Sequence, residues 1–304
     1  MGEAVRETFL SVTGEALHKR LWLPQGEPRA VIQLIHGMAE HIDRYDATAK
    51  ALNGAGFAVV GHNHLGHGQG AKTLGYFSQK GGWDALIEDT QALRTATQAA
   101  YPGIPYFLLG HSMGSFVARG YALKHEKGLA GLILSGTGHF DPAVLVVGRL
   151  VARVQCALGG GEKPSGVLAS MSSAGYNKTY GQARTTFDWL SSDPAVVDAY
   201  IADPFCGFTF TARAYRDMFE GLSRLYPSKL SAMEKDVPVL LFAGEDDPVG
   251  AYGKGVKKVA EEIKGAGVKD VTLRLYEKGR HEMFNEKERE HVWADLIAWV
   301  EEKA

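Results

Sequence analysis

The chain of 304 residues has few of the features that mark nucleic-acid, metal or secreted proteins. Lysine and arginine number 33 against 35 acidic residues, so the formal net charge is −2 and no basic excess is available for a phosphate backbone. The two cysteines, Cys156 and Cys206, match neither a metal-ligand spacing nor a disulfide framework, which favours reduced thiols in a cytoplasmic protein. No secretory signal stands at the N-terminus, and no apolar run approaches the length that spans a bilayer.

The glycine-rich and histidine-rich segments also lack the residues that a cofactor site requires. No Gly-Lys-Ser/Thr follows Gly66 and Gly68, so this loop is not a phosphate-binding loop. His62, His64 and His67 lie within six positions, but no aspartate, glutamate or cysteine joins them in a usual zinc ligand set. The sequence therefore predicts no metal and no cofactor, and a loop here that supports a site.

The most informative segment that is present is a Gly-x-Ser-x-Gly pentapeptide centred on Ser112. It follows the apolar run 106–109 and precedes residues 115–123, whose apolar spacing suits a helix. A serine on a tight turn from strand to helix has a strained backbone, and the flanking glycines remove the clashes that a Cβ would cause. This context predicts a nucleophile, which in turn needs a base and an orienting acid.

Both partners are found downstream, each after a segment with the pattern of a strand. Asp247 follows the apolar run 237–244, and His281 follows the alternating run 271–276. The order Ser, Asp, His is the one used by α/β-hydrolases. We therefore expect Ser112 as nucleophile, His281 as general base and then acid, and Asp247 as the residue that orients the imidazole. The neighbouring Asp246 is the alternative acid, and whichever of the two is not used would cap a helix.

An early strand, residues 30–35, ends in a His-Gly turn that completes the expected site. In this architecture such a turn brings one backbone N–H toward the serine, and the residue after the nucleophile supplies the other. The two oxyanion donors would be the N–H groups of Met38 and Met113. Substrate contacts are expected from the residues beside these groups, His36, Gly37 and His111.

Strand and helix patterns alternate along most of the chain, which predicts a mostly parallel, eight-stranded sheet with helices on both faces. The alternation stops between about residues 139 and 226, where helical patterns replace strands. We expect residues 1–138 and 227–304 to form an α/β-hydrolase core, and residues 139–226 a helical cap inserted before the last two strands.

The most apolar segment of this cap is residues 143–152, in which Arg149 is the one charge. It is either a buried core helix or a lid helix that lines an acyl pocket through Leu145 and Val146 and touches lipid surfaces. Because the segment is so uniformly apolar, deep membrane insertion as an amphipathic helix is not expected.

Taken together, the motifs resemble the monoacylglycerol lipase and lysophospholipase-like branch of the α/β-hydrolases. The matching segments are 36–41 with 44–45, 66–68, 110–114, 187–193, Tyr200 with 203–208, 244–250 and 280–283. The resemblance implies the same triad and oxyanion donors and no cofactor, with Asp247 matching the acid of the family's Gly-x-x-Asp-Pro pattern. Two positions depart from that pattern: Asn63 stands where aspartate is usual and Gly70 where serine is common.

The function expected from these observations is hydrolysis of a carboxylic ester of a single-chain acyl lipid, a monoacylglycerol or a lysophospholipid, through an acyl-enzyme. The same triad would serve a small-ester carboxylesterase, a thioesterase, a proline-directed aminopeptidase or a carbon–carbon bond hydrolase. A hydrolase-shaped binding protein is the alternative from another class, and the presence of both Ser112 and His281 argues against it. Acyl-chain length, head group and oligomeric state do not follow from the sequence.

Overall fold

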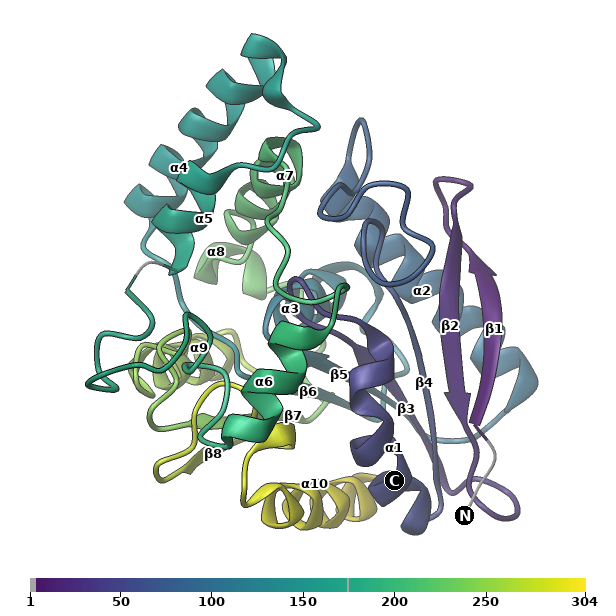
Figure 1. Cartoon of the computed structure of the whole chain (residues 1–304). Helices are drawn as coiled ribbons and strands as arrows, with labels where there is room; N and C mark the ends of the chain where they lie inside the picture. Colours follow the sequence, from purple (N-terminus) through teal and green to yellow (C-terminus); the bar gives the residue numbers. More distant parts are fainter. Residues whose placement is uncertain (1–3, 174) are drawn as a thin grey trace.

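The computed structural model describes residues 4–173 and 175–304, and its centre is one eight-stranded sheet (Figure 1). The strands are β1 (Ala4–Leu10), β2 (Ala16–Trp22), β3 (Ala30–Ile35), β4 (Phe57–His62), β5 (Tyr106–His111), β6 (Gly131–Ser135), β7 (Val239–Gly244) and β8 (Val271–Tyr276). They lie in the order β1-β2-β4-β3-β5-β6-β7-β8. The pairs β1–β2 and β2–β4 are antiparallel, and the remaining pairs are parallel. This arrangement confirms the α/β-hydrolase fold that the sequence predicts.

Helices cover both faces of the sheet, which explains why the central strands are apolar at nearly every position. In β3, Ile32 and Leu34 belong to the core on one face, whereas Val31 and Ile35 belong to the core on the other. The first face is covered by α1 (Asp46–Gly54) and α10 (Arg289–Lys303). The second is covered by α2 (Gly82–Ala100), α3 (Met113–His125) and α9 (Lys254–Gly265). Because the central strands run in the same direction, their carboxyl ends lie at a common edge, where loops can meet.

Between β6 and β7 the chain leaves the sheet and forms a helical insertion. Its elements are α4 (Pro142–Gln155), the π-helical turn η2 (Cys156–Gly160), α5 (Gly166–Ser173), α6 (Pro194–Ala202), α7 (Ala212–Leu222) and α8 (Pro227–Leu230). In Figure 1, α4, α5 and α7 stand above the sheet and α6 lies near α1. The predicted insertion before the last two strands is confirmed, and its limits at residues 139 and 226 stay a prediction.

The helix α4 contradicts the expectation that no apolar run approaches the length that spans a bilayer. Together α4 and η2 form a helix, Pro142–Gly160, that is long and apolar enough to cross a membrane by length and composition alone. Arg149 and Arg153 interrupt the apolar run in the sequence, which is why the run looks too short there. Only 17% of an 18-residue apolar stretch of this helix is buried. Its exposed apolar side chains are Val144, Val146, Val147, Leu150, Val154 and Leu158.

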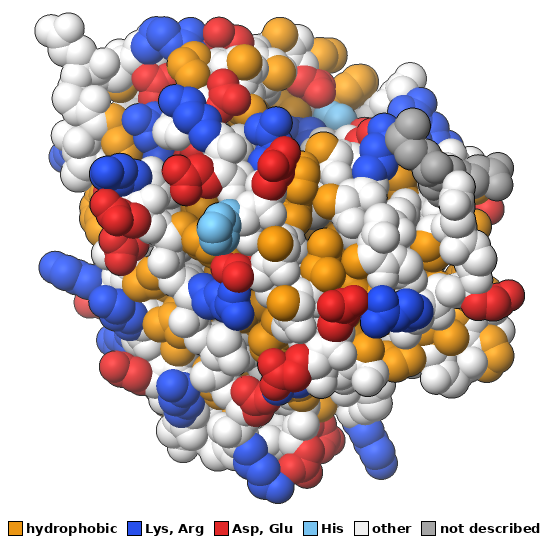
Figure 2. Space-filling model, turned by 90° about the horizontal axis from the view of Figure 1, so that it is seen from below, with side chains coloured by type: hydrophobic (Ala, Val, Ile, Leu, Met, Phe, Trp, Pro, Cys, Tyr) orange, Lys and Arg blue, Asp and Glu red, His pale blue; other side chains and the backbone are white. Residues whose placement is uncertain are grey.

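The surface away from the cap carries charges of both signs. Figure 2 shows the molecule from below, with lysine and arginine side chains interspersed with aspartate and glutamate. On this face no large patch of positive charge is seen, in agreement with the small net charge of the chain.

Candidate active site

Ser112 occupies the sharp turn between β5 and α3. Its φ of 52° and ψ of −121° place a non-glycine residue in a region that L-residues rarely adopt. A Cβ on Gly110 would collide with the backbone of Gly114, and a Cβ on Gly114 would collide with the carbonyl oxygen of Ile35. Both glycines of the pentapeptide are thus required by close backbone approach. The strained turn is held on one side by the Ser112 N–H, which donates to the Ser135 carbonyl at 2.9 Å.

His281 and Asp247 form a buried pair at the ends of β8 and β7. The distance from His281 Nδ1 to Asp247 Oδ2 is 3.0 Å, and the side chains are 2% and 0% exposed. Burial alone would lower the pKa of His281, but the Asp247 carboxylate opposes this effect and the pKa is raised above its usual value. The other oxygen of Asp247 accepts the Val249 N–H at 2.8 Å, which fixes the carboxylate.

This geometry distinguishes the two neighbouring aspartates. Asp246 is exposed, whereas Asp247 faces the histidine. The expectation that the second aspartate caps a helix was wrong, because the N-cap of the following helix, α9, is Gly253.

The His281 ring packs against two other aromatic rings. The His111 ring lies 4.9 Å away and the Trp189 ring, from the cap, lies 5.0 Å away. A Cβ on Gly136 would stand 3.1 Å from His281 Cε1, so this edge of the imidazole lies beside the residue that follows Ser135. Since Ser135 also bonds to the Ser112 backbone, the histidine and the serine flank the same strand end.

The turn of residues 36–41, hereafter the oxyanion turn, passes directly against the serine. A Cβ on Gly37 would stand 3.2 Å from the Cβ of Ser112 and 2.6 Å from Glu40 Oε1. Any larger residue at this predicted substrate-contact position would therefore displace the turn or the nucleophile. Among the described residues, the N–H groups of Met38 and Met113 donate to no backbone acceptor outside the regular elements.

Three buried histidines fix the backbone of this turn. The His36 ring accepts from the His64 N–H at 3.0 Å and its Nδ1 lies 2.8 Å from the Gly37 carbonyl. His64 Nε2 lies 3.1 Å from the His36 carbonyl. His67 Nε2 accepts from the Ala39 N–H at 3.3 Å. An accepting nitrogen must be unprotonated, so His36 and His67 are neutral here, and the predicted substrate residue His36 instead supports the turn.

The burial of these histidines, and of the neighbouring His62, predicts that the protein loses stability in mild acid. Burial lowers the pKa of His62 to about 3, of His64 to about 4 and of His67 to about 3. The unfolded chain, with histidine pKa values near 6.5, then binds more protons, so the free energy of unfolding falls as the pH drops below about 6.5. Each histidine contributes a slope of up to about 1.4 kcal/mol per pH unit down to its folded pKa.

Urea unfolding between pH 4.5 and 8 measures this slope. The variant His62→Leu removes one buried imidazole and should make the slope shallower, whereas exposed His291→Gln controls for loss of a histidine from the surface. A free energy of unfolding that stays constant from pH 7 to pH 5 would contradict the prediction.

A buried charge network joins the oxyanion turn to the loop that carries His281. No motif in the sequence predicted a role for this network. Glu40 accepts hydrogen bonds from the Gly37 N–H at 2.5 Å, from Tyr45 Oη at 2.8 Å and from Arg44 at 2.6 Å. Arg44 also forms a bidentate pair with Glu282, at 2.7 Å for each bond. Because Glu282 follows His281 in the chain, one guanidinium ties the two loops of the site together. The pairing spans 238 positions, and no local sequence signal predicts it.

The two predicted acyl contacts on α4 have different environments. Leu145 is buried and lies with Arg119 and Leu222 around a small cavity between cap and core. Val146 is 57% exposed. The structure thus places Leu145 in the interior and Val146 on the outer surface of the cap.

Comparisons with known proteins agree with this fold. Residues 26–288 match the family model described as serine aminopeptidase, S33. A monoacylglycerol lipase of Mycolicibacterium smegmatis is 28% identical over 96% of this chain and 95% of its own length, and the human monoglyceride lipase is 29% identical over 97% and 90%. The crystal structure of a thermostable carboxyl esterase from Bacillus coagulans superposes with a TM-score of 0.92 at 31% identity, covering 99% of both chains. With the match spanning most of its length, the chain belongs to the serine aminopeptidase, S33, family of α/β-hydrolases.

Proposed function

We propose that the protein is a serine hydrolase that cleaves carboxylic esters of single-chain acyl lipids, monoacylglycerols or lysophospholipids. The observation that carries the proposal is that the strained Ser112 turn and the buried His281–Asp247 pair flank the same strand end, at Ser135 and Gly136. A serine in such a turn with a carboxylate-oriented imidazole nearby is the arrangement used for acyl transfer.

In the proposed mechanism Ser112 Oγ attacks the acyl carbonyl and His281 Nε2 takes the hydroxyl proton. Asp247 holds the proton of His281 on Nδ1 and stabilises the imidazolium that forms. The N–H groups of Met38 and Met113 stabilise the oxyanion, and His281 then protonates the leaving alcohol. Water, activated by the same imidazole, attacks the acyl-enzyme and releases the fatty acid and free Ser112.

The choice of a lipid acyl group is supported by the apolar cap and by the relatives. Leu145, Phe140 and Leu222 supply apolar surface between cap and core. An acyl chain held against apolar cap residues gains about 0.8 kcal/mol per buried methylene. The M. smegmatis and human relatives are monoacylglycerol and monoglyceride lipases.

A panel of p-nitrophenyl esters from two to sixteen carbons, with monoacylglycerols and lysophosphatidylcholine, tests the substrate class. The proposal expects kcat/KM to rise from acetate to at least octanoate, because longer chains bury more apolar surface. A maximum at acetate would favour the second candidate, a small-ester carboxylesterase, which the likeness to the B. coagulans carboxyl esterase supports.

We also propose that the outer face of α4 rests on a lipid surface while the enzyme takes up substrate. The exposed apolar side chains of α4 and η2 recur every three or four residues, from Val144 through Val147, Leu150 and Val154 to Leu158. A contiguous apolar stripe on a helix of this length favours an apolar phase over water. Because both ends of the helix return to the fold, the proposal is a helix lying on the surface.

This surface role predicts that Leu150→Glu weakens binding to phosphatidylcholine vesicles about tenfold or more, since a charge replaces a side chain that is 61% exposed. Vesicle sedimentation measures the binding, and turnover of soluble p-nitrophenyl butyrate should change less than twofold. The matched control is Leu10→Glu, which places the same charge at a 67% exposed leucine of β1. Equal vesicle binding by wild type and Leu150→Glu would contradict the role of α4.

A further inference from the structure

The carbonyl group of Ala39, in the oxyanion turn, accepts hydrogen bonds from two groups of the cap. It accepts the Gly207 N–H at 2.9 Å and the Tyr200 hydroxyl at 2.9 Å. Ala39 has a φ of 52°, a left-handed conformation that an alanine adopts only when its surroundings impose it. Tyr200 is buried and belongs to α6, so its hydroxyl reaches the turn from the insertion.

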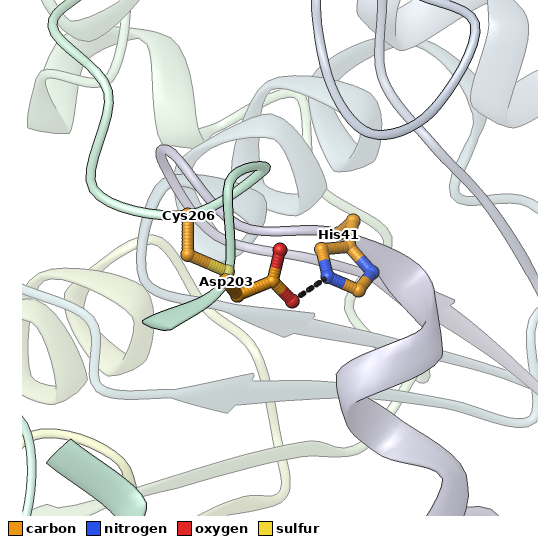
Figure 3. Close-up of side chains that lie close together, drawn as sticks. All are labelled: His41, Asp203 and Cys206. Atoms are coloured by element: carbon orange, nitrogen blue, oxygen red, sulfur yellow. Dashed lines mark hydrogen bonds and ion pairs between the residues drawn. The ribbon is translucent and has the colours of Figure 1, made fainter. Parts of the chain in front are cut away.

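Residues 200–207, hereafter the cap anchor, hold the turn at a further point shown in Figure 3. His41 Nε2 lies 2.8 Å from Asp203 Oδ2, and the two side chains point toward each other from the turn and the anchor. The Arg44 guanidinium lies 4.8 Å from the centroid of the Tyr200 ring. Since Arg44 also bonds Glu40 and Glu282, the anchor contacts the network that joins the two catalytic loops.

His41, Asp203 and Cys206 have ligand atoms within 4.8 Å of one another, but their bonds favour an anchor over a metal site. One Asp203 oxygen pairs with His41, and the other accepts the Phe205 N–H at 2.8 Å. Burial raises the pKa of the Cys206 thiol, so the thiolate that a metal ligand must be is harder to form here. His41 and Asp203 are therefore already engaged, with each other across the turn and the anchor, and Asp203 also with the Phe205 N–H.

The backbone groups around Met38 are each held by a different partner. The Gly37 carbonyl pairs with the His36 ring and the Gly37 N–H with Glu40. The Ala39 N–H pairs with His67, and the Ala39 carbonyl pairs with the anchor. Among the described residues no backbone acceptor outside the regular elements pairs with the Met38 N–H, so this donor is available for an oxyanion. The cap contributes the contact on the carbonyl side.

We infer that Tyr200 is a positioning residue for the oxyanion hole: its hydroxyl, with the Gly207 N–H, holds the Ala39 peptide so that the Met38 N–H is aimed at the developing oxyanion. The inference rests on the proposed function of Ser112. It means that the cap completes the catalytic apparatus in addition to covering it, so that an undocked cap leaves the oxyanion hole incomplete. Oxyanion donors act on the transition state, so a misplaced donor lowers kcat more than it raises KM.

The test compares Tyr200→Phe, which removes one oxygen and keeps the ring over Arg44, with wild type. We measure kcat and KM for p-nitrophenyl butyrate, Ki for an alkyl trifluoromethyl ketone that forms an oxyanion adduct, and the thermal midpoint. The inference expects kcat to fall about tenfold and Ki to rise by the same factor, because both depend on the oxyanion donors, with KM within twofold. The assays are run well below the thermal midpoint, where circular dichroism shows the variant folded.

The matched control is Tyr215→Phe, another buried cap tyrosine, whose ring packs with Phe210 and Phe219 in the cap. Its kcat and Ki should stay within twofold of wild type. Unchanged kcat and Ki in Tyr200→Phe, an equal loss in Tyr215→Phe, or a loss entirely in KM would overturn the inference alone. Failure of the wild-type protein to hydrolyse the ester or bind the ketone would overturn the proposed function together with it.

Discussion

Replacing Ser112 with alanine is expected to lower kcat/KM toward every ester substrate by about 10⁵- to 10⁶-fold, as loss of the nucleophile does in other serine hydrolases. The structure assigns this position no packing role that alanine cannot fill, because the turn is made by Gly110, Gly114 and backbone bonds. The thermal midpoint should therefore change by a few degrees at most. Steady-state hydrolysis and differential scanning fluorimetry measure the two effects.

The residual activity of Ser112→Ala carries information as well. The oxyanion donors and His281 remain, and such sites retain some acceleration over water. A variant that keeps more than one hundredth of wild-type kcat/KM while folded would mean that another residue is the nucleophile.

The second large effect is expected for Asp247→Asn, which should lower kcat about 10⁴-fold, since an asparagine favours the wrong tautomer of the histidine. The pKa of His281 is also affected, because burial lowers it and the Asp247 carboxylate raises it. Removing the carboxylate therefore lowers this pKa. Since a general base must be neutral, wild-type activity should rise with pH through a value above 6.5, and the acidic limb should move to lower pH in the variant.

The matched control is Asp246→Asn at the exposed neighbouring position. It should change kcat and the pH profile less than twofold. Equal losses in the two variants, or an unshifted acidic limb in Asp247→Asn, would contradict the assignment of Asp247.

The core fold was predictable because its signals are local. The runs 30–35, 106–109 and 131–135 are apolar at nearly every position, as strands buried on both faces must be, and each lies in an observed strand. The nucleophile turn was predictable for a similar reason, since glycines at 110 and 114 report steric demands of the turn itself. In contrast the edge strand β1 (Ala4–Leu10) gives a weak signal, because most of its side chains are exposed.

The contacts that complete the site were not predictable, because they join residues far apart in the chain. Arg44 meets Glu282 across 238 positions, and Tyr200 meets Ala39 across 161. A local sequence pattern does not indicate which distant residues pair in the fold. The same limit applies to α4, whose apolar residues suit either a buried or a lipid-facing helix until the structure shows which of them are exposed.

The most direct measurement of the central claim is reaction of the native protein with an alkyl fluorophosphonate, followed by peptide mass spectrometry. The account predicts one stoichiometric adduct on Ser112, formed at a rate that rises with pH through the His281 pKa and lost in Ser112→Ala. A folded protein that forms no adduct, or whose adduct maps to another residue, would contradict it.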